Sequence, residues 1–193
     1  MDEFNNYRAL LAQVDGFGAQ VARLHAGELR CRRGCTACCR QDLSVSRVEA
    51  EFLLRFLVER GELPPSDGAK AEADDHPLFD ALASGPDACV FLGPEGACGV
   101  YEARPIICRT HGFPLQLADG AVDVCPLNFQ AHAAEGYATI PKGARLGLDA
   151  LNQKLGLVDL LYSRAQGEEP GRFLLSGVRE AAQEILAAGG GVL

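Results

Sequence analysis

Hydrophobic residues recur at helical spacing near the start of the chain. Between residues 2 and 27 they fall at steps of three and four, which predicts an amphipathic helix. A second helix is predicted to begin after Ser46, because Ser46 and Glu49 have the spacing of a capping box. Gly61 follows the last residue with this periodicity, so the second helix is expected to end there.

The same periodicity returns in the C-terminal part. Residues 144–165 are rich in leucine and predict a helix, and residues 170–187, with Pro170 near their start, predict a last one. Residues 86–126 are interrupted by Gly and Pro at short intervals and predict only short strands, in CVFL and CGVY. The expected fold is therefore mainly α, with helices from both termini packed round a loop-rich, cysteine-liganded metal core.

Composition and charge exclude some classes of protein. Of 193 residues, 48% are hydrophobic and 23% charged, which is typical of a globular chain rather than a disordered one. A formal net charge of −8 argues against a general binder of nucleic acid or of an anionic membrane. Residues 61–77 predict a solvated, Pro-rich acidic loop, and residues 61–80 hold six acids and one lysine. No apolar run is long enough to predict a membrane span.

Cysteine is the unusual part of the composition. The chain has eight cysteines, no Trp and one Met, and all eight cysteines lie between positions 31 and 125. The N-terminal sequence MDEFNNYRALLAQVDGF does not resemble a signal peptide, so we expect a cytoplasmic protein with reduced thiols. A dense set of reduced cysteines favours metal or redox chemistry over a disulfide framework.

The candidate metal ligands are Cys31, Cys35, Cys38, Cys39, Cys89, Cys98, Cys108 and Cys125. The two-residue step from Cys35 to Cys38 lets two thiolates converge on one ion. The adjacent Cys38 and Cys39 diverge in most backbone conformations, which favours two metals, a cluster, or one free thiol. Soft thiolates select zinc or iron–sulfur clusters. We expect an iron–sulfur cluster slightly more than zinc, because eight thiolates exceed one zinc site.

Arginines flank these cysteines at Arg30, Arg32, Arg33, Arg40, Arg104 and Arg109. They would offset the negative charge of a thiolate centre, or they are ordinary surface charges, and both interpretations stay open. His111 is expected to lie near the site without being a ligand, while His76 and His132 lack ligand-type spacing. His25 is expected at the end of the first helix, where a cation suits the helix dipole. Tyr101 is expected to pack beside the site.

The triad Cys31-x3-Cys35-x2-Cys38 also has the spacing found in radical S-adenosylmethionine enzymes. That triad normally opens a long βα barrel, and no run of alternating strands and helices follows it here. The match is therefore partial.

Three segments carry a family resemblance: CRRGCTACC, CVFL and CGVYEARPIICRTHGFP. They resemble the YkgJ-like cysteine-cluster family, also described as the CxxCxxCC zinc- or iron-chelating domain. The likeness covers residues 31–126 and rests on the adjacent Cys38–Cys39 pair, Cys89-x-Phe-Leu, and Cys98-x2-Tyr101 followed by Arg104-Pro105-x2-Cys108-Arg109. It implies metal chelation by these cysteines and no assigned activity for most members. Flagellin lysine methylases look like distant relatives.

These observations lead to one expected function and two alternatives. We expect a metal-binding protein that holds iron–sulfur clusters or zinc for a redox or structural role. The alternatives are a cluster-dependent, methylase-like enzyme that modifies a protein side chain, and a zinc-stapled interaction scaffold. Residues 1–143 are predicted to form the cysteine-cluster domain and residues 144–193 a helical extension of it. The expected partner is a metal ion or cluster, with no nucleic acid or membrane, and a protein partner stays open.

Overall fold

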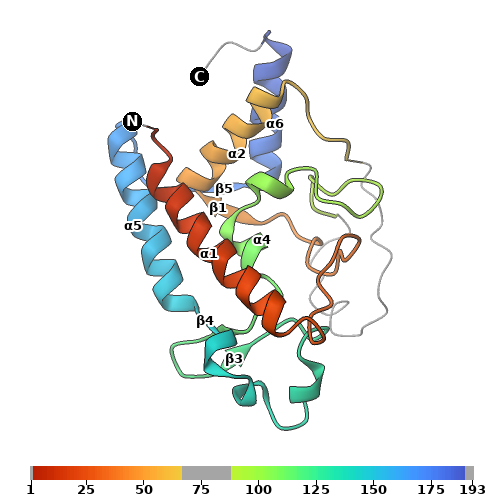
Figure 1. Cartoon of the computed structure of the whole chain (residues 1–193). Helices are drawn as coiled ribbons and strands as arrows, with labels where there is room; N and C mark the ends of the chain where they lie inside the picture. The colour runs from red at the N-terminus through yellow and green to blue at the C-terminus, as the bar shows by residue number, and fades with distance from the viewer. Residues whose placement is uncertain (1, 67–87, 190–193) are drawn as a thin grey trace. The chain divides into compact units, whose positions relative to one another are not determined.

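A computed structural model describes residues 2–66 and 88–189 (Figure 1). The α-helices are α1 (Asn5–Leu24), α2 (Arg47–Arg60), α4 (Ile106–Thr110), α5 (Leu148–Gln166) and α6 (Leu175–Ala187). The strands are β1 (Ser44–Ser46), β2 (Leu115–Gln116), β3 (Val122–Asp123), β4 (Leu146–Gly147) and β5 (Arg172–Leu174), and short 3-10 helices are η1 (Tyr101–Ala103), η2 (Gln130–His132), η3 (Tyr137–Thr139) and η4 (Lys142–Ala144). The prediction of a mainly α fold is confirmed.

The chain divides into two units. The first contains Met1–Cys31 and Ile106–Glu169, and the second contains Arg32–Pro105 and Pro170–Leu193. Each unit is therefore built from segments that are distant in the sequence. The sequence predicts a cysteine-cluster domain (1–143) with a helical extension (144–193). That division concerns which part of the chain binds metal, so the packing of the helices does not test it and it stays a prediction.

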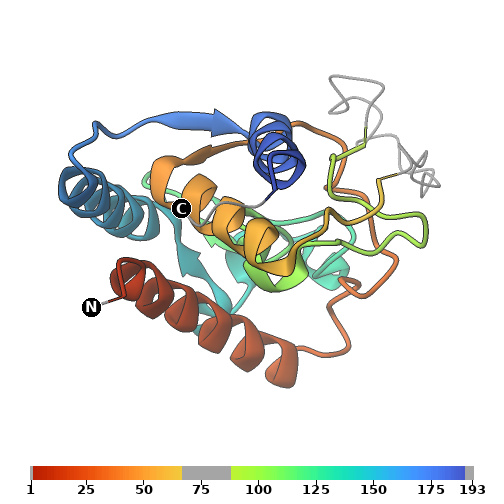
Figure 2. The ribbon, with the colours of Figure 1, turned by 90° about the horizontal axis from the view of Figure 1, so that it is seen from above.

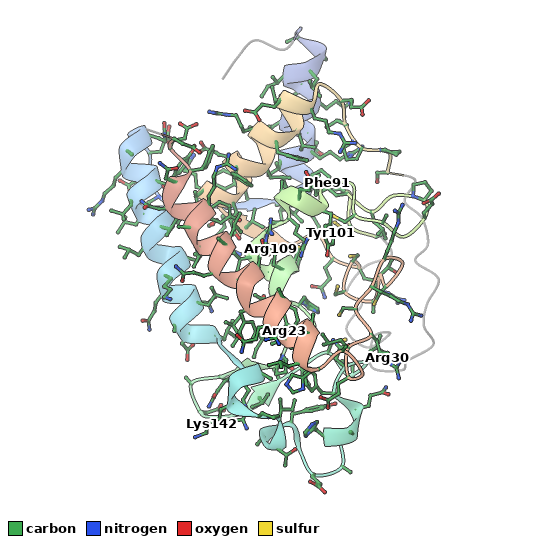
Figure 3. All side chains as sticks on the ribbon, in the orientation of Figure 1. Arg23, Arg30, Phe91, Tyr101, Arg109 and Lys142 are labelled. Atoms are coloured by element: carbon green, nitrogen blue, oxygen red, sulfur yellow. The ribbon has the colours of Figure 1, made fainter. Side chains whose placement is uncertain are left out.

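In the first unit, α1 packs against both α5 and α4. The rings of Phe4 and Tyr162 stack with their centroids 5.2 Å apart. On the α4 side, Arg109 reaches Asp15 of α1 with its guanidinium 2.7 Å from the carboxylate (Figure 3). Gly18 lets this part of α1 approach closely, because a Cβ there would lie 3.1 Å from the Phe113 ring. These contacts fix α4, which carries Cys108.

The end of α1 lies over a small hydrophobic core in the same unit. Val21, Phe129 and Ile140 are buried at its centre. A short sheet of order β3-β2-β4 lies alongside, in which β2 is antiparallel to β3 and parallel to β4. Burial of Phe129 holds the segment that follows Cys125.

In the second unit, α2 and α6 lie side by side (Figure 2). The capping box predicted at the start of α2 is present, with the Ser46 amide donating to Glu49 Oε2 over 3.0 Å. The helix ends at Gly61, whose φ of 74° is the left-handed conformation that glycine favours. Both predicted boundaries of this helix are confirmed.

The last helix starts later than predicted. Residues 172–174 form β5, which pairs antiparallel with β1, so α6 begins at Leu175 rather than near Pro170. The two strand-like pieces predicted at CVFL and CGVY are reduced to one antiparallel bridge between Leu92 and Cys98. Within the described ranges, no helix has the length and apolar character to span a membrane. Residues 67–77 of the predicted acidic loop, and residues 86–87 of the predicted loop-rich segment, lie outside the described residues.

Candidate metal centre

The first cysteines of the second unit lie on consecutive tight turns. The Cys35 amide donates to the Arg32 carbonyl over 3.0 Å, and the Cys39 amide donates to the Thr36 carbonyl over 2.8 Å. Gly34 has a φ of 90°, in the left-handed region that an L side chain rarely adopts. Turns of this kind bring thiols together without a helix or a strand.

A hairpin carries Cys98 back toward Cys89. The Gly99 amide donates to the Phe91 carbonyl over 2.8 Å, and Leu92 and Cys98 form a bridge. At the base of the hairpin, the Cys89 amide donates to the Cys39 carbonyl over 2.9 Å. Backbone hydrogen bonds thus link the segments that carry these cysteines.

The tip of the hairpin contacts the first cysteine turn. A Cβ on Gly96 would lie 3.1 Å from Thr36 Cγ2 and 3.4 Å from Gly34 Cα. Arg33 and Glu95 add a salt bridge of 3.0 Å, although both side chains are exposed and it contributes little. Cys35, between Gly34 and Thr36, is thereby held next to the hairpin.

Cys38 and Cys39 interact directly. The pKa of the Cys39 thiol is raised, first because of its hydrogen bond with Cys38, then because of burial, and then because of the charges of Cys38, Cys89 and Cys98. The four sulfur atoms are therefore within electrostatic reach of one another.

Burial is the main cause of the raised pKa at the two hairpin cysteines. For Cys89 it outweighs the opposing hydrogen bond from the Phe91 amide, and the charge of Cys98 acts with it. For Cys98 it outweighs the Val100 amide and the Arg104 guanidinium, both of which lower the pKa. Each of these sulfurs thus has a donor that favours its charged form.

The other cysteines belong to the first unit. Cys108 lies on α4, and Cys125 precedes a turn in which its carbonyl accepts from the Asn128 amide over 2.8 Å. Cys31 Sγ accepts a hydrogen bond from Asn128 Nδ2 over 3.3 Å. All eight cysteines lie in the described part of the chain, and among them Cys31 is exposed while the others are half-buried.

The arginines near the cysteines differ in role. Arg104 lowers the pKa of Cys98, which supports charge compensation there. Arg109 is buried and paired with Asp15, so it holds α4 to α1. Tyr101, expected to pack beside the site, is 62% exposed, and its ring stacks with the Arg104 guanidinium, which lies 3.7 Å from the ring centre.

Two features of the first unit were not found from the sequence. One is Asn128, a fully buried side chain with no spacing signal. The other is a pair of contacts to Glu28, whose carboxylate lies 2.7 Å from His25 Nδ1 and 3.1 Å from His132 Nε2. The separation of Glu28 from His25 is that of one helical turn, but nothing local indicates His132.

Over residues 2–66 and 88–189, no three His, Cys, Asp or Glu side chains form a group that could hold a metal ion as they stand. Cys38, Cys89 and Cys98 nevertheless each raise the pKa of Cys39 through their charge, so these four thiols affect one another's protonation. The Cys38 and Cys39 thiols hydrogen-bond to each other, whereas Cys89 and Cys98 hydrogen-bond to backbone amides. A thiol that becomes a metal ligand must first lose its proton.

A helical protein whose turns gather thiols in this way has the features of a metal-chelating protein. A family model described as "CxxCxxCC: Putative zinc- or iron-chelating domain" matches residues 30–126, which are half of the chain and include all eight cysteines. The chain belongs to this family. Comparisons with curated proteins and with solved structures give no match.

Proposed function

We propose that this protein holds one or more iron–sulfur clusters through its cysteine thiolates, in a redox or structural role. The ligands would come from Cys31, Cys35, Cys38, Cys39, Cys89, Cys98, Cys108 and Cys125. The observation that carries the proposal is the hydrogen bond from the Cys89 amide to the Cys39 carbonyl, because it joins the two cysteine-bearing segments of the second unit.

The donor set supports an iron–sulfur cluster more than zinc. Cys38, Cys39, Cys89 and Cys98 would supply the four thiolates that one cluster or one zinc ion requires, and further cysteines remain. Adjacent thiols at Cys38 and Cys39 suit a cluster, whose iron atoms are separated in space, better than one small ion. When bound, a cluster would supply one-electron chemistry and would also stabilise the fold.

The protein's own groups would offset the charge of the bound thiolates. The Phe91 amide hydrogen-bonds to Cys89 and the Val100 amide to Cys98, while the Arg104 guanidinium lies near Cys98. Hydrogen bonds to ligand sulfurs are among the main determinants of affinity and reduction potential. These donors would favour the thiolate form at the moment when metal replaces the protons.

Anaerobic purification followed by a visible spectrum and analysis for iron, zinc and acid-labile sulfide tests this proposal. Brown protein with iron and sulfide in matched amounts is the expected result. Cys98→Ser should lose most of the metal, whereas Ala97→Ser, the adjacent position in the same hairpin, should retain it. Colourless protein that carries zinc would overturn the cluster and favour a zinc-stapled scaffold. Full retention of metal by Cys98→Ser would remove Cys98 from the ligand set.

A further inference from the structure

We propose that Asn128 is a positioning residue for Cys31, holding the Cys31 sulfur in place as a metal ligand through a side-chain N–H···S hydrogen bond. This inference rests on the proposed function, because it takes Cys31 to be a ligand. Cys31 needs such support more than the other cysteines, since it is the exposed one among the eight. An exposed thiol on a loop otherwise loses much side-chain freedom when it is fixed at a metal.

Every polar group of the Asn128 side chain has a partner, and the partners fix its orientation. Its Oδ1 accepts from the Arg30 amide over 2.7 Å, and its Nδ2 donates to the Gly112 carbonyl over 2.7 Å. A flipped side-chain amide would set donor against donor at Arg30 and acceptor against acceptor at Gly112. The second Nδ2 hydrogen therefore belongs to Cys31 Sγ, 3.3 Å away.

Asn128 also connects the segments that carry the cysteines of the first unit. Its backbone amide donates to the Cys125 carbonyl over 2.8 Å, and its side chain reaches both the Arg30–Cys31 segment and Gly112. Gly112 follows α4, which carries Cys108. Asn128 itself is fully buried, and its hydrogen bond to the Gly112 carbonyl is shielded from water.

Gly112 completes the pocket for the sulfur. A Cβ at this position would lie 2.6 Å from Cys31 Sγ and 3.1 Å from Asn128 Nδ2, and its φ is 102°. The sulfur thus lies directly against backbone, with the Asn128 amide beside it. Only glycine leaves room for Cys31 in this orientation.

The hydrogen bond would serve the bound state more than the free state. A thiolate is a stronger acceptor than a thiol, so the Nδ2–H donor gains strength when the proton leaves Cys31. Loss of a hydrogen-bonded partner of a ligand typically lowers metal affinity about 10- to 100-fold. For Asn128 we expect an effect of that size, directed at one ligand.

Asn128→Asp tests the proposal, with Asn152→Asp on the exposed face of α5 as its control. Aspartate keeps the shape and the acceptor for Arg30, but when ionised it can donate neither to the Cys31 sulfur nor to the Gly112 carbonyl. Zinc affinity, measured against a chromophoric chelator, should fall about 10- to 100-fold in Asn128→Asp and stay unchanged in Asn152→Asp. Alkylation of the zinc-loaded protein, mapped by mass spectrometry, should then label Cys31 in Asn128→Asp while the other cysteines stay protected.

A second pair of variants tests the sulfur pocket. Gly112→Ala and Gly120→Ala both place alanine at a positive φ, 102° and 86°, but the Gly120 position has no atom within 4 Å. Backbone strain is therefore similar, and only Gly112→Ala crowds the sulfur. Gly112→Ala should release Cys31 to alkylation, and Gly120→Ala should not. Equal labelling of Cys31 in both variants would contradict the proposal.

The outcomes separate this inference from the proposed function. Asn128→Asp with unchanged zinc affinity and a protected Cys31 would overturn the inference and leave the proposed function standing. Wild-type protein in which zinc or iron with sulfide protects no thiol would overturn the proposed function, and the ligand role of Cys31 with it. In wild type, the side-chain amide resonances of Asn128 should also shift during a zinc titration. Resonances that stay fixed while zinc binds would overturn the inference without any substitution.

Discussion

The backbone amide of Cys89 donates a hydrogen bond of 2.9 Å to the carbonyl of Cys39, and this bond joins two distant parts of the sequence. The bond connects the turns that carry residues 35–39 with the hairpin that carries Cys98. Short loops of this kind bury little apolar surface, so their geometry depends on hydrogen bonds and on whatever the thiols bind. Metal binding and local folding should therefore be coupled in the second unit.

Substitution of Cys38 or Cys89 by serine should lower metal content and stability together. Each change removes a soft ligand and leaves a hydroxyl that binds zinc or iron poorly. Metal analysis and thermal unfolding of each variant, with and without a chelator, check this prediction. Ala97→Ser is the matched control, because it adds the same hydroxyl beside Cys98. Serine variants that retain wild-type metal content and melting temperature would contradict the coupling.

Metal binding should release protons and strengthen as the pH rises. Burial and neighbouring thiols raise the pKa of Cys39, Cys89 and Cys98 above the ordinary value of 9.0, so these thiols are protonated at neutral pH in the metal-free protein. Each one that becomes a ligand must lose its proton. A zinc titration in weak buffer should acidify the solution, and affinity should increase between pH 6 and 8.

The raised pKa values of these thiols also determine how the stability of the metal-free protein changes with pH. Because the folded state holds these protons more tightly than the unfolded chain, their contribution to stability is complete below pH 9.0 and is lost as the pH rises above it. Urea unfolding of the metal-free protein should accordingly show declining stability above that pH. A Cys39→Ser variant should show a weaker decline, and an identical decline would exclude Cys39 as a contributor.

The sequence was sufficient for elements that depend on local signals. The capping pair Ser46 and Glu49 and the terminal Gly61 define α2, because the groups that start and end a helix lie within one turn of it. The start of α6 could not be predicted in this way. Residues 172–174 are strand because they pair with Ser44–Ser46, and that pairing partner lies in a distant part of the sequence.

In the candidate site, too, some features could be predicted from the sequence and others could not. Spacing and residue type were enough to select the cysteines, because a soft ligand is recognisable on its own. Which thiols approach one another depends on the bond between Cys39 and Cys89, and that pairing has no signal in the sequence. Asn128 could be predicted even less, because an isolated asparagine belongs to no motif. Its importance follows only from its contacts in the folded chain.

The ion pair between Arg109 and Asp15 should stabilise the first unit. The Arg109 side chain is 6% exposed, whereas that of Asp15 is 49% exposed, and the shortest contact is 2.7 Å. Asp15→Ala would leave the buried guanidinium without this partner, at a cost of about 1–3 kcal/mol in the free energy of unfolding. Glu62→Ala breaks the exposed pair between Arg60 and Glu62 and should cost less than about 1 kcal/mol. Urea unfolding of both variants measures the difference, and equal costs would contradict it.

Glu28 should stabilise the same unit by joining segments on either side of it in the sequence. Its carboxylate contacts His25 at 2.7 Å and His132 at 3.1 Å, and its backbone carbonyl accepts from the Phe129 amide over 2.9 Å. Glu28→Ala removes both side-chain contacts and should lower the free energy of unfolding by about 1–3 kcal/mol. Glu135→Ala provides the control, because Glu135 is an exposed acid in the same unit. Urea unfolding of the two variants measures this. If they prove equally stable, the histidine contacts contribute nothing to the stability of this unit.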